Sequence, residues 1–315
     1  MAFLPTFADV QKAQEIIKKY AHRTPVLTSS SINKIVGGNL FFKCENLQKV
    51  GAFKFRGACN AVFLLSEEEA KKGVATHSSG NHAAALALAA KMRGIAAHIV
   101  MPNNSPEIKK KAVAGYGAKI TFCEPTLQAR ESTLAQVVAT TGATEIHPYN
   151  NFNVIAGQGT AAKEMIEDYG DFDIIIAPVG GGGLLSGTAL STKYLLPNCK
   201  VIAAEPAGAD DAFQSFQAKK IIPSVNPKTI ADGLLTSLGE RNFAIIIENV
   251  DDIICVSEEK IVEAMRMIWE RMKIIIEPSS AVPLAAILEG KIDVQNKKVG
   301  IILSGGNLDL GKLPF

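Results

Sequence analysis

Runs of apolar, β-branched residues alternate along this chain with longer stretches of helical composition, and this alternation limits the folds it can form. The runs are continuously apolar, so a sheet built from them must be covered on both faces. Helices between successive strands provide that cover and supply the crossovers that parallel strands require. The sequence therefore predicts an α/β fold with parallel sheets covered by helices. The predicted strands are residues 40–44, 74–77, 96–101, 119–122, 173–179, 201–205, 252–256 and 299–304. Predicted helices lie between them at residues 58–65, 81–93, 105–115, 127–140, 157–168, 184–196 and 258–271.

Length, charge and cysteine content indicate a globular protein whose partners are small molecules. Its 315 residues exceed what one core usually organises, so two lobes are expected. With 33 basic and 31 acidic side chains, the net charge of +2 gives no reason to expect nucleic-acid binding, and residues 109–111 (KKK) are interpreted as a solvated helix face. Five scattered cysteines favour a cytoplasmic protein, and no run reaches the roughly 18 apolar residues of a membrane span.

Four consecutive glycines, Gly180, Gly181, Gly182 and Gly183, connect a predicted strand to a predicted helix. Residues without Cβ let the backbone approach a ligand closely, and the N–H groups that open a helix attract anions, so the loop predicts a phosphate site. A tight turn is the structural alternative. A dinucleotide is a second alternative, because Glu205 follows Gly183 by 22 residues and suits a ribose, although no G-x-G-x-x-G is present.

Two further polar segments follow predicted strands, and ligands collect at such carboxyl ends. Residues 78–82 (SSGNH) follow one strand, and residues 304–307 (SGGN) follow another. The first segment contains more polar residues than a helix cap needs, so it predicts a pocket for a substrate carboxylate, with an N-cap cluster as the alternative. All three segments should face one cleft.

Lys54 and an acidic loop complete the candidate residues. Lys54 is flanked by two phenylalanines, precedes a predicted helix and has Arg56 nearby, so its neutral amine should be accessible, as a Schiff-base lysine requires. A surface lysine is the alternative. The acidic loop contains Glu205, Asp210 and Asp211, whose oxygens suit a magnesium, manganese or calcium ion, although a solvated loop explains them equally well.

Taken together, these motifs resemble the fold-type II pyridoxal-phosphate (PLP) enzymes, and within them the serine racemase and serine/threonine dehydratase group, which includes threo-3-hydroxyaspartate ammonia-lyases. The resemblance covers nearly the whole chain. The motifs that carry it are residues 51–57 (GAFKFRG), 78–82 (SSGNH), 155–160 (IAGQGT), 180–183 (GGGG), 229–233 (TIADG), 269–273 (WERMK) and 304–307 (SGGN).

The resemblance implies a tryptophan synthase β-like fold and a role for each matching residue. Lys54 would hold the cofactor and exchange the Cα proton on one face of the substrate, and Ser79 would serve the opposite face. Ser304 would meet the pyridine nitrogen, and a serine there does not force that nitrogen to be protonated. The implied cofactor-binding residues are Phe53, Lys54, Asn81, Gly180, Gly181, Gly182, Gly183, Gly233 and Ser304. The implied substrate-binding residues are Ser78, Asn81, His82 and Arg130, and a divalent cation would be held by Glu205, Ala209 and Asp211.

We therefore expect a large PLP-binding domain, residues 1–72 and 148–315, with a small inserted domain, residues 73–147. The expected reaction is α,β-elimination of a β-hydroxy amino acid such as L-serine or L-threonine to a 2-oxo acid and ammonia, accompanied by serine racemisation. Serine racemisation as the main activity, elimination from threo-3-hydroxyaspartate and β-replacement of the cysteine-synthase type are the alternatives.

The same resemblance leads us to expect a homodimer. Val50 stands where the vertebrate members of the group have a threonine beside a nucleotide site, which leaves ATP as an effector in doubt. Two departures from the pattern, Ala83-Ala84 after His82 and the pair Asn150-Asn151, leave substrate preference open.

Overall fold

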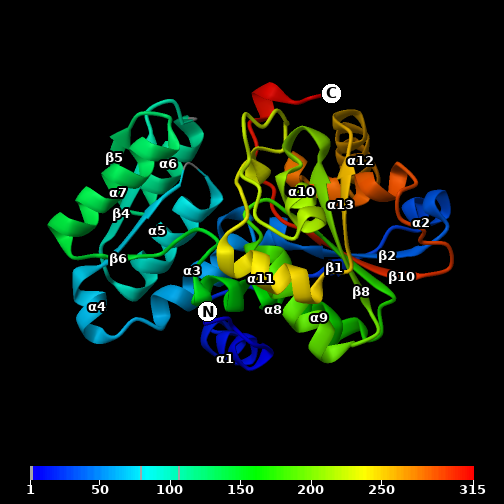
Figure 1. The fold of residues 1–315 in the computed structure, drawn as a ribbon, viewed down its shortest axis with the longest axis horizontal. Helices are drawn as coiled ribbons and strands as arrows, with labels where there is room; N and C mark the ends of the chain where they lie inside the picture. Colours follow the sequence, from blue (N-terminus) through cyan, green and yellow to red (C-terminus); the bar gives the residue numbers. More distant parts are fainter. Residues whose placement is uncertain (1–2, 79, 106) are drawn as a thin grey trace.

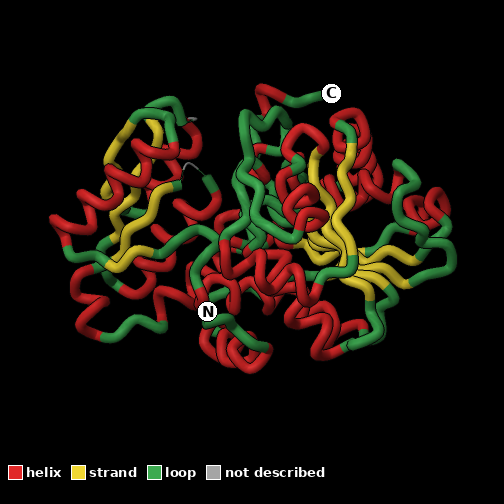
Figure 2. The backbone as a smooth tube through the Cα atoms, viewed as in Figure 1, coloured by secondary structure: helices red, strands yellow, loops and turns green. Residues whose placement is uncertain are grey.

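The computed structural model describes residues 3–78, 80–105 and 107–315. Its strands form two sheets, a large one and a small one, which lie side by side in Figure 1. Helical segments surround both sheets (Figure 2). The predicted α/β fold with helix-covered parallel sheets is confirmed.

The large sheet has six strands in the order β1-β2-β10-β7-β8-β9. Only β1 is antiparallel to its neighbour, so the other five strands end at one edge of the sheet. That edge carries the glycine loop after β7 and the serine segment after β10. The strands are β1 (Val26–Leu27), β2 (Asn39–Cys44), β10 (Lys298–Leu303), β7 (Ile174–Pro178), β8 (Lys200–Pro206) and β9 (Asp252–Val256).

The small sheet has four parallel strands in the order β5-β4-β3-β6. These strands all fall within residues 73–147, for which an inserted domain is predicted; the boundaries of that domain stay a prediction. We call this sheet and its helices α5, α6 and α7 the small lobe. The strands are β5 (Lys119–Cys123), β4 (Ala97–Pro102), β3 (Val74–His77) and β6 (Thr144–Glu145). The two-residue strands β1 and β6 are too short to show a pattern, and the sequence did not predict them.

Helices connect most of these strands, and several begin or end at clear capping signals. Helix α8 begins five residues earlier than predicted because the Asn151 side chain accepts hydrogen bonds from the N–H groups of Asn153 and Val154. Helix α5 ends at Gly94, whose φ of 74° is left-handed. The helices are α1 (Phe7–Ile17), α2 (Ser30–Val36), α3 (Lys54–Phe63), α4 (Glu67–Lys72), α5 (Asn81–Arg93), α6 (Glu107–Gly115), α7 (Leu127–Thr141), α8 (Phe152–Tyr169), α9 (Gly183–Leu195), α10 (Asp211–Ala218), α11 (Glu240–Asn249), α12 (Glu258–Met272) and α13 (Pro278–Leu288).

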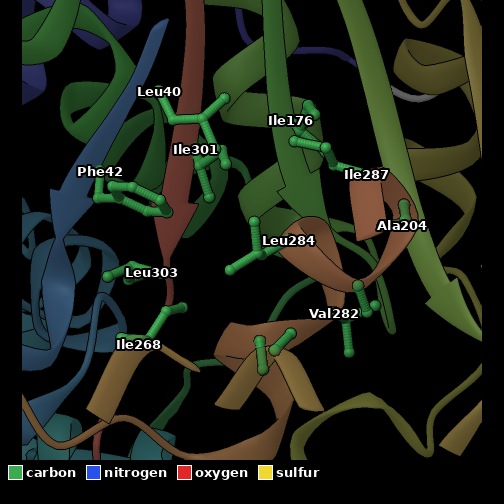
Figure 3. Packing of buried hydrophobic residues seen from close by; sticks show 14 of the residues in the cluster. Leu40, Phe42, Ile176, Ala204, Ile268, Val282, Leu284, Ile287, Ile301 and Leu303 are labelled. Carbon is green, nitrogen blue, oxygen red and sulfur yellow. The ribbon is translucent and has the colours of Figure 1, made fainter. Parts of the chain in front are cut away.

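The large sheet is buried on both faces, which explains its continuously apolar strands. On one face, side chains of β2, β7 and β10 pack against α12 and α13, as Leu284 and Ile287 do against Ile176 (Figure 3). The other face packs against α8, α9 and α11 through a second apolar cluster. Together these layers fix the position of the carboxyl edge.

Helices α3, α8 and α9 pack so closely that glycine is required where they touch. A Cβ on Gly157 of α8 would lie 2.6 Å from the Cα of Gly57 on α3. A Cβ on Gly187 of α9 would lie 2.4 Å from the backbone nitrogen of Gly159 on α8. Because real Cβ atoms do not come this close to backbone, the glycines of residues 155–160 serve helix packing. No helix in the described ranges is both long enough and apolar enough to cross a membrane.

Candidate active site

A cavity of about 300 Å³ lies where the carboxyl ends of both sheets meet. It receives residues from the ends of β3, β7 and β10 and from the first turns of α3, α5 and α9. Ser79 lies outside the described residues. The predicted residues that line the cavity are Phe53, Lys54, Ser78, Asn81, His82, Arg130, Gly180, Gly181, Gly182, Gly183, Gly233 and Ser304. The structure thus brings together every described residue predicted to bind cofactor or substrate.

A second cavity, of about 660 Å³, lies at the opposite edge of the large sheet. Its walls include Asp173 and Lys200, which flank the amino ends of β7 and β8. It is larger, but it contains none of the predicted site residues that the structure describes. The smaller cavity is therefore the candidate active site.

Lys54 occupies the first position of α3, and its Nζ points into the cavity wall. The Phe53 N–H donates to the carbonyl oxygen of Ser304 at 3.0 Å, which ties the start of α3 to the end of β10. Nζ donates to the carbonyl oxygen of Pro148 at 2.9 Å. Removal from water lowers the pKa of Lys54 to about 8, and the Glu277 carboxylate acts in the opposite direction. The amine can therefore lose its proton near neutral pH.

Arg56 does not contribute to this lowered pKa, contrary to the sequence-based argument. Its guanidinium is fully buried away from the cavity and donates to Glu45 and Glu164 at 2.7 to 2.8 Å. These two carboxylates neutralise its charge locally. The Lys43 ammonium also donates to Glu164, at 2.7 Å, so four charged side chains form one buried network.

The glycine loop has the properties of an anion cradle. Within the described chain, the N–H groups of Gly180, Gly181 and Gly182 donate no hydrogen bond to the protein. The loop is also packed too tightly for side chains, since a Cβ on Gly181 would lie 2.4 Å from the Tyr149 ring. Gly182 has a φ of 90° and directly precedes α9. Free N–H groups at a helix start fit a phosphate.

The small lobe contributes Ser78, Asn81 and His82 around the start of α5. The Asn81 side chain donates to the Glu277 carboxylate at 3.1 Å. The His82 Nε2 lies 3.0 Å from the carbonyl oxygen of Ile146, which can only accept, so this nitrogen donates. Burial lowers the pKa of His82 to about 3, so the ring is neutral and its Nδ1 is an acceptor. For a substrate carboxylate, this residue can offer its backbone N–H but no side-chain proton.

Ser304 and Gly233 approach the cavity from the large sheet. The Ser304 Oγ lies 3.0 Å from the Ser280 Oγ, which also lies 2.7 Å from the carbonyl oxygen of Gly305. The Gly233 N–H donates to the Ser279 Oγ at 3.1 Å. Ser279 and Ser280 lie in the first turn of α13, so this helix organises the floor of the cavity.

Glu277 is the site residue that sequence reasoning missed most clearly. It precedes α13, is 3% exposed and lines the cavity. Burial raises the pKa of its carboxyl to about 7. The sequence did offer one signal, because Glu277 directly precedes Pro278. Proline is common at the first position of a helix, so an acid before it lies at a helix start. Tyr149, which packs against the glycine loop, carried no comparable signal.

Lys109 corrects the interpretation of residues 109–111 as a solvated face. Its Nζ donates to an Asp232 carboxylate oxygen at 2.5 Å, and both residues line the cavity. Lys109 belongs to α6 of the small lobe, whereas Asp232 lies between α10 and α11, in the connection from β8 to β9 of the large sheet, so the ion pair spans the cleft. Arg130 and His77 line the same side of the cavity, and burial together with the nearby Arg130 charge lowers the pKa of His77.

The predicted cation residues lie away from the cavity, between β8 and α10. Glu205 is fully buried and accepts from the N–H groups of Ala212 at 3.1 Å and Phe213 at 2.9 Å. Both Asp211 carboxylate oxygens are buried without a partner among the described residues. Burial raises the pKa of Glu205 to about 9 and that of Asp211 to about 6.

Two buried carboxylates, one of them unpartnered, fit a hard divalent cation together with the carbonyl oxygen of Ala209. Within the described ranges, no three or more His, Cys, Asp or Glu side chains gather in a way that could hold a metal. The cation role of Glu205, Ala209 and Asp211 therefore stays a prediction. Glu205 does not line the cavity, which counts against the ribose role of the dinucleotide alternative.

Fold and cavity together define an α/β enzyme class in which a lysine of lowered pKa faces a phosphate cradle across one cleft. Residues 17–305 match the family described as "Pyridoxal-phosphate dependent enzyme", and the chain belongs to this family. The free N–H groups of the loop and the Lys54 amine fit the phosphate and the aldehyde of that cofactor. The chain is a PLP-dependent enzyme.

Relatives agree with this assignment over almost the full length. The chain is 55% identical to a serine racemase of Dictyostelium discoideum over 98% of this chain and 96% of that protein. It is 51% identical to a beta-hydroxyaspartate dehydratase of Paracoccus denitrificans over 99% of each chain. The structure of maize serine racemase superimposes with a TM-score of 0.96 at 48% identity, covering 98% of this chain and 95% of that one.

Proposed function

We propose that this enzyme eliminates water from a β-hydroxy amino acid such as L-serine or L-threonine to give an enamine, which water then hydrolyses to a 2-oxo acid and ammonia. We also propose that it racemises serine. The observation that carries the proposal is the Lys54 amine, whose pKa of about 8 lets it act as a base in a cavity that also holds an anion cradle. The names of the relatives support both activities.

The residues of the cavity divide the work of such a reaction. Bound PLP supplies an electron sink for the pair left on Cα when the proton leaves. The Gly180–Gly182 N–H groups bind the phosphate, and Lys54 Nζ accepts the Cα proton on one face of the substrate. Ser78 and the N–H groups at the start of α5 orient the substrate carboxylate. Phe53, Gly233 and Ser304 enclose the cofactor and exclude water.

Ser79 is the proposed acid and base on the opposite face. Its hydroxyl would return a proton to Cα from the side that Lys54 does not reach, and this would give the D-enantiomer. Elimination requires a base on one face only, so the two activities should separate on mutation.

The test compares Lys54→Ala and Ser79→Ala with wild type, using the exposed Lys71→Ala as the matched control. We expect Lys54→Ala to lose both activities and its yellow colour, because no amine remains to bind the aldehyde. Borohydride should fix the cofactor on Lys54 of wild type, as peptide mass spectrometry would detect. Ser79→Ala should lose D-serine formation and keep part of its 2-oxo acid formation from L-serine. Turnover by Lys54→Ala would contradict the proposal.

A second candidate function is elimination from threo-3-hydroxyaspartate. The observation that favours it is Arg130, a cation that lines the cavity and suits a second substrate carboxylate. Lys109 lines the same cavity but is paired with Asp232. Comparing kcat/KM for threo-3-hydroxyaspartate, L-serine and L-threonine decides between these substrates. Assays with sulfide as a co-substrate test the β-replacement alternative, which requires that a sulfur-containing amino acid forms.

The assembly and regulation proposed for the enzyme rest on the family resemblance of its sequence. A homodimer is proposed, and the exposed Leu47 and Ile275 on adjoining loops are compatible with a buried interface there. A cytoplasmic location is supported by the five cysteines, all described and all free. Activation by ATP is not proposed, since Val50 lacks a hydroxyl. Sedimentation, and assays with and without ATP or a divalent cation, test these points.

A further inference from the structure

A buried carboxylate that no role so far explains lies between the two lobes. Glu277 of the large lobe accepts from Asn81 Nδ2 through both of its oxygens, each at 3.1 Å. One of these oxygens also accepts from the Asn307 N–H at 3.1 Å. The Glu277 N–H donates to the carbonyl oxygen of Gly305 at 3.0 Å, so the residue is fixed at both its backbone and its side chain.

The space around this carboxylate is as restricted as its hydrogen bonds. A Cβ on Gly305 would lie 2.9 Å from Glu277 Oε1, and a Cβ on Gly233 would lie 3.9 Å from the same oxygen. The missing side chain of Gly305 therefore leaves room for the carboxylate, whereas the distance from Gly233 is an ordinary van der Waals contact.

Glu277 and Asn307 together determine which way the Asn81 amide points. The Asn307 Nδ2 donates to Asn81 Oδ1 at 3.0 Å and to the carbonyl oxygen of Val50 at 2.7 Å. The Asn81 Nδ2 must then face the carboxylate, since the reversed amide would set its oxygen against Glu277. The Asn81 amide, which lines the cavity, is thereby held in one orientation.

The charges around Glu277 come from three elements. Asp232, from the loop that follows α10, raises the pKa of Glu277, and Lys109, from α6, lowers it. Lys54, from α3, is the cation on which Glu277 acts. Lys54 and Glu277 line the same cavity. The negative charge of Glu277 raises the pKa of Lys54, so it favours the protonated amine.

We propose that Glu277 is a positioning residue of the active site, which orients the Asn81 amide toward the cofactor and holds a proton on the nitrogen of Lys54. The inference deepens the proposed function and rests on the role given there to Lys54. A purely structural role, in which Glu277 only satisfies the Asn307 N–H, would affect stability and leave the proton affinity of Lys54 unchanged.

Glu277→Gln tests the charge, because glutamine keeps the volume and one accepting oxygen. We expect the pH midpoint of the visible absorbance of the bound cofactor to fall by about one unit or more in the holoenzyme, as loss of a nearby opposite charge does. In the full chain stripped of cofactor, the pH midpoint of Lys54 acetylation, followed by peptide mass spectrometry, should fall as well. Glu289→Gln, at the far end of α13, is the matched control and should shift neither midpoint.

Asn307→Ala tests the orientation of the amide without changing a charge. It removes the donor to Asn81 Oδ1, so we expect kcat to fall on the order of tenfold with both midpoints unchanged. Glu277→Asp retains the charge one methylene further from Asn81 and should behave in the same way. If Glu277→Gln does not fold, the Glu277→Asp variant decides. Unchanged pH midpoints together with a normal kcat in that variant would overturn the proposal.

Two results separate this inference from the proposed function. Unchanged midpoints in a folded Glu277→Gln enzyme refute the role of Glu277 and leave the role of Lys54 intact. Failure of borohydride to label Lys54 in wild type refutes the proposed function itself.

Discussion

Replacing Arg56 with methionine should cost this protein several kcal/mol of stability, because it leaves one buried carboxylate charge uncompensated. The guanidinium is fully buried and donates four hydrogen bonds of 2.7 to 2.8 Å to Glu45 and Glu164. Arg56 and Lys43 balance the two acids, so the variant leaves one uncompensated negative charge. Breaking a buried pair in this way costs about 3–5 kcal/mol.

This loss of stability translates into a measurable shift in melting temperature. An unfolding entropy of about 2.1 cal/mol/K per residue gives about 0.66 kcal/mol/K for 315 residues. The Tm of the cofactor-free variant should therefore fall by about 5–8 °C. Circular dichroism of wild type and variant, recorded without cofactor, measures the shift without any contribution from ligand binding.

The charge balance of this network also fixes how the stability difference between variant and wild type depends on pH. In wild type, burial alone would raise the pKa of Glu164, but the charges of Arg56 and Lys43 outweigh it, so the pKa is lowered. The lowered pKa stabilises the fold at pH values above the unfolded pKa, and this stabilisation is lost as pH falls through the folded pKa. Without Arg56, burial raises the carboxylate pKa, so the variant is least stable above that value. The Tm difference should shrink as pH falls from 8 toward about 4.5.

A double variant provides the control. Arg56→Met with Glu45→Gln removes one charge of each sign and keeps the Lys43–Glu164 pair at 2.7 Å, so it should recover part of the lost stability. Two results would refute this reasoning. One is a Tm of Arg56→Met that falls equally at pH 5 and pH 8. The other is a double variant whose loss of stability equals the sum of the losses of the two single variants.

Two further predictions concern the cation residues and the glycine loop. The raised pKa values mean that Glu205 destabilises the cation-free fold increasingly as pH rises from 4.5 to about 9, and that Asp211 does so from 3.8 to about 6. Magnesium or calcium should thus raise Tm more at pH 8 than at pH 6, and Asp211→Asn should abolish this difference; no cation effect in wild type at pH 8 would exclude the site. Gly181→Ala should lose about 1–3 kcal/mol of unfolding free energy, since its Cβ would lie 2.4 Å from the Tyr149 ring. Gly115→Ala has open space around its Cβ and should stay within about 1 kcal/mol of wild type in denaturant titrations.

Much of the fold was predictable, because a long apolar run indicates both that a strand forms and that it is buried. Strands at residues 74–77 and 252–256 match their predicted bounds, as does the helix at 81–93. Helix starts were less predictable: α3 begins at Lys54 rather than at residue 58, since no periodic apolar pattern marks its first turn. Strands of two residues carry no pattern at all.

The site was predictable where a residue follows a strand and unpredictable where it crosses the cleft. Lys54, Asn81 and Ser304 were found because motifs contain them. Glu277 and Lys109 were missed because their partners, Asn81 and Asp232, are separated from them by more than 100 residues. Nothing in the local sequence distinguishes such a charge from one that faces solvent.

The glycine contacts between α3, α8 and α9 have a further consequence. Helix α3 begins with Lys54 and α9 begins at the phosphate loop, and α8 touches both helices backbone to backbone. The span between amine and cradle is therefore set by main-chain atoms, with no side chain acting as a spacer that mutation could lengthen or trim. A larger side chain at Gly57, Gly157, Gly159 or Gly187 would therefore push these helices apart and change the distance between Lys54 and the glycine loop.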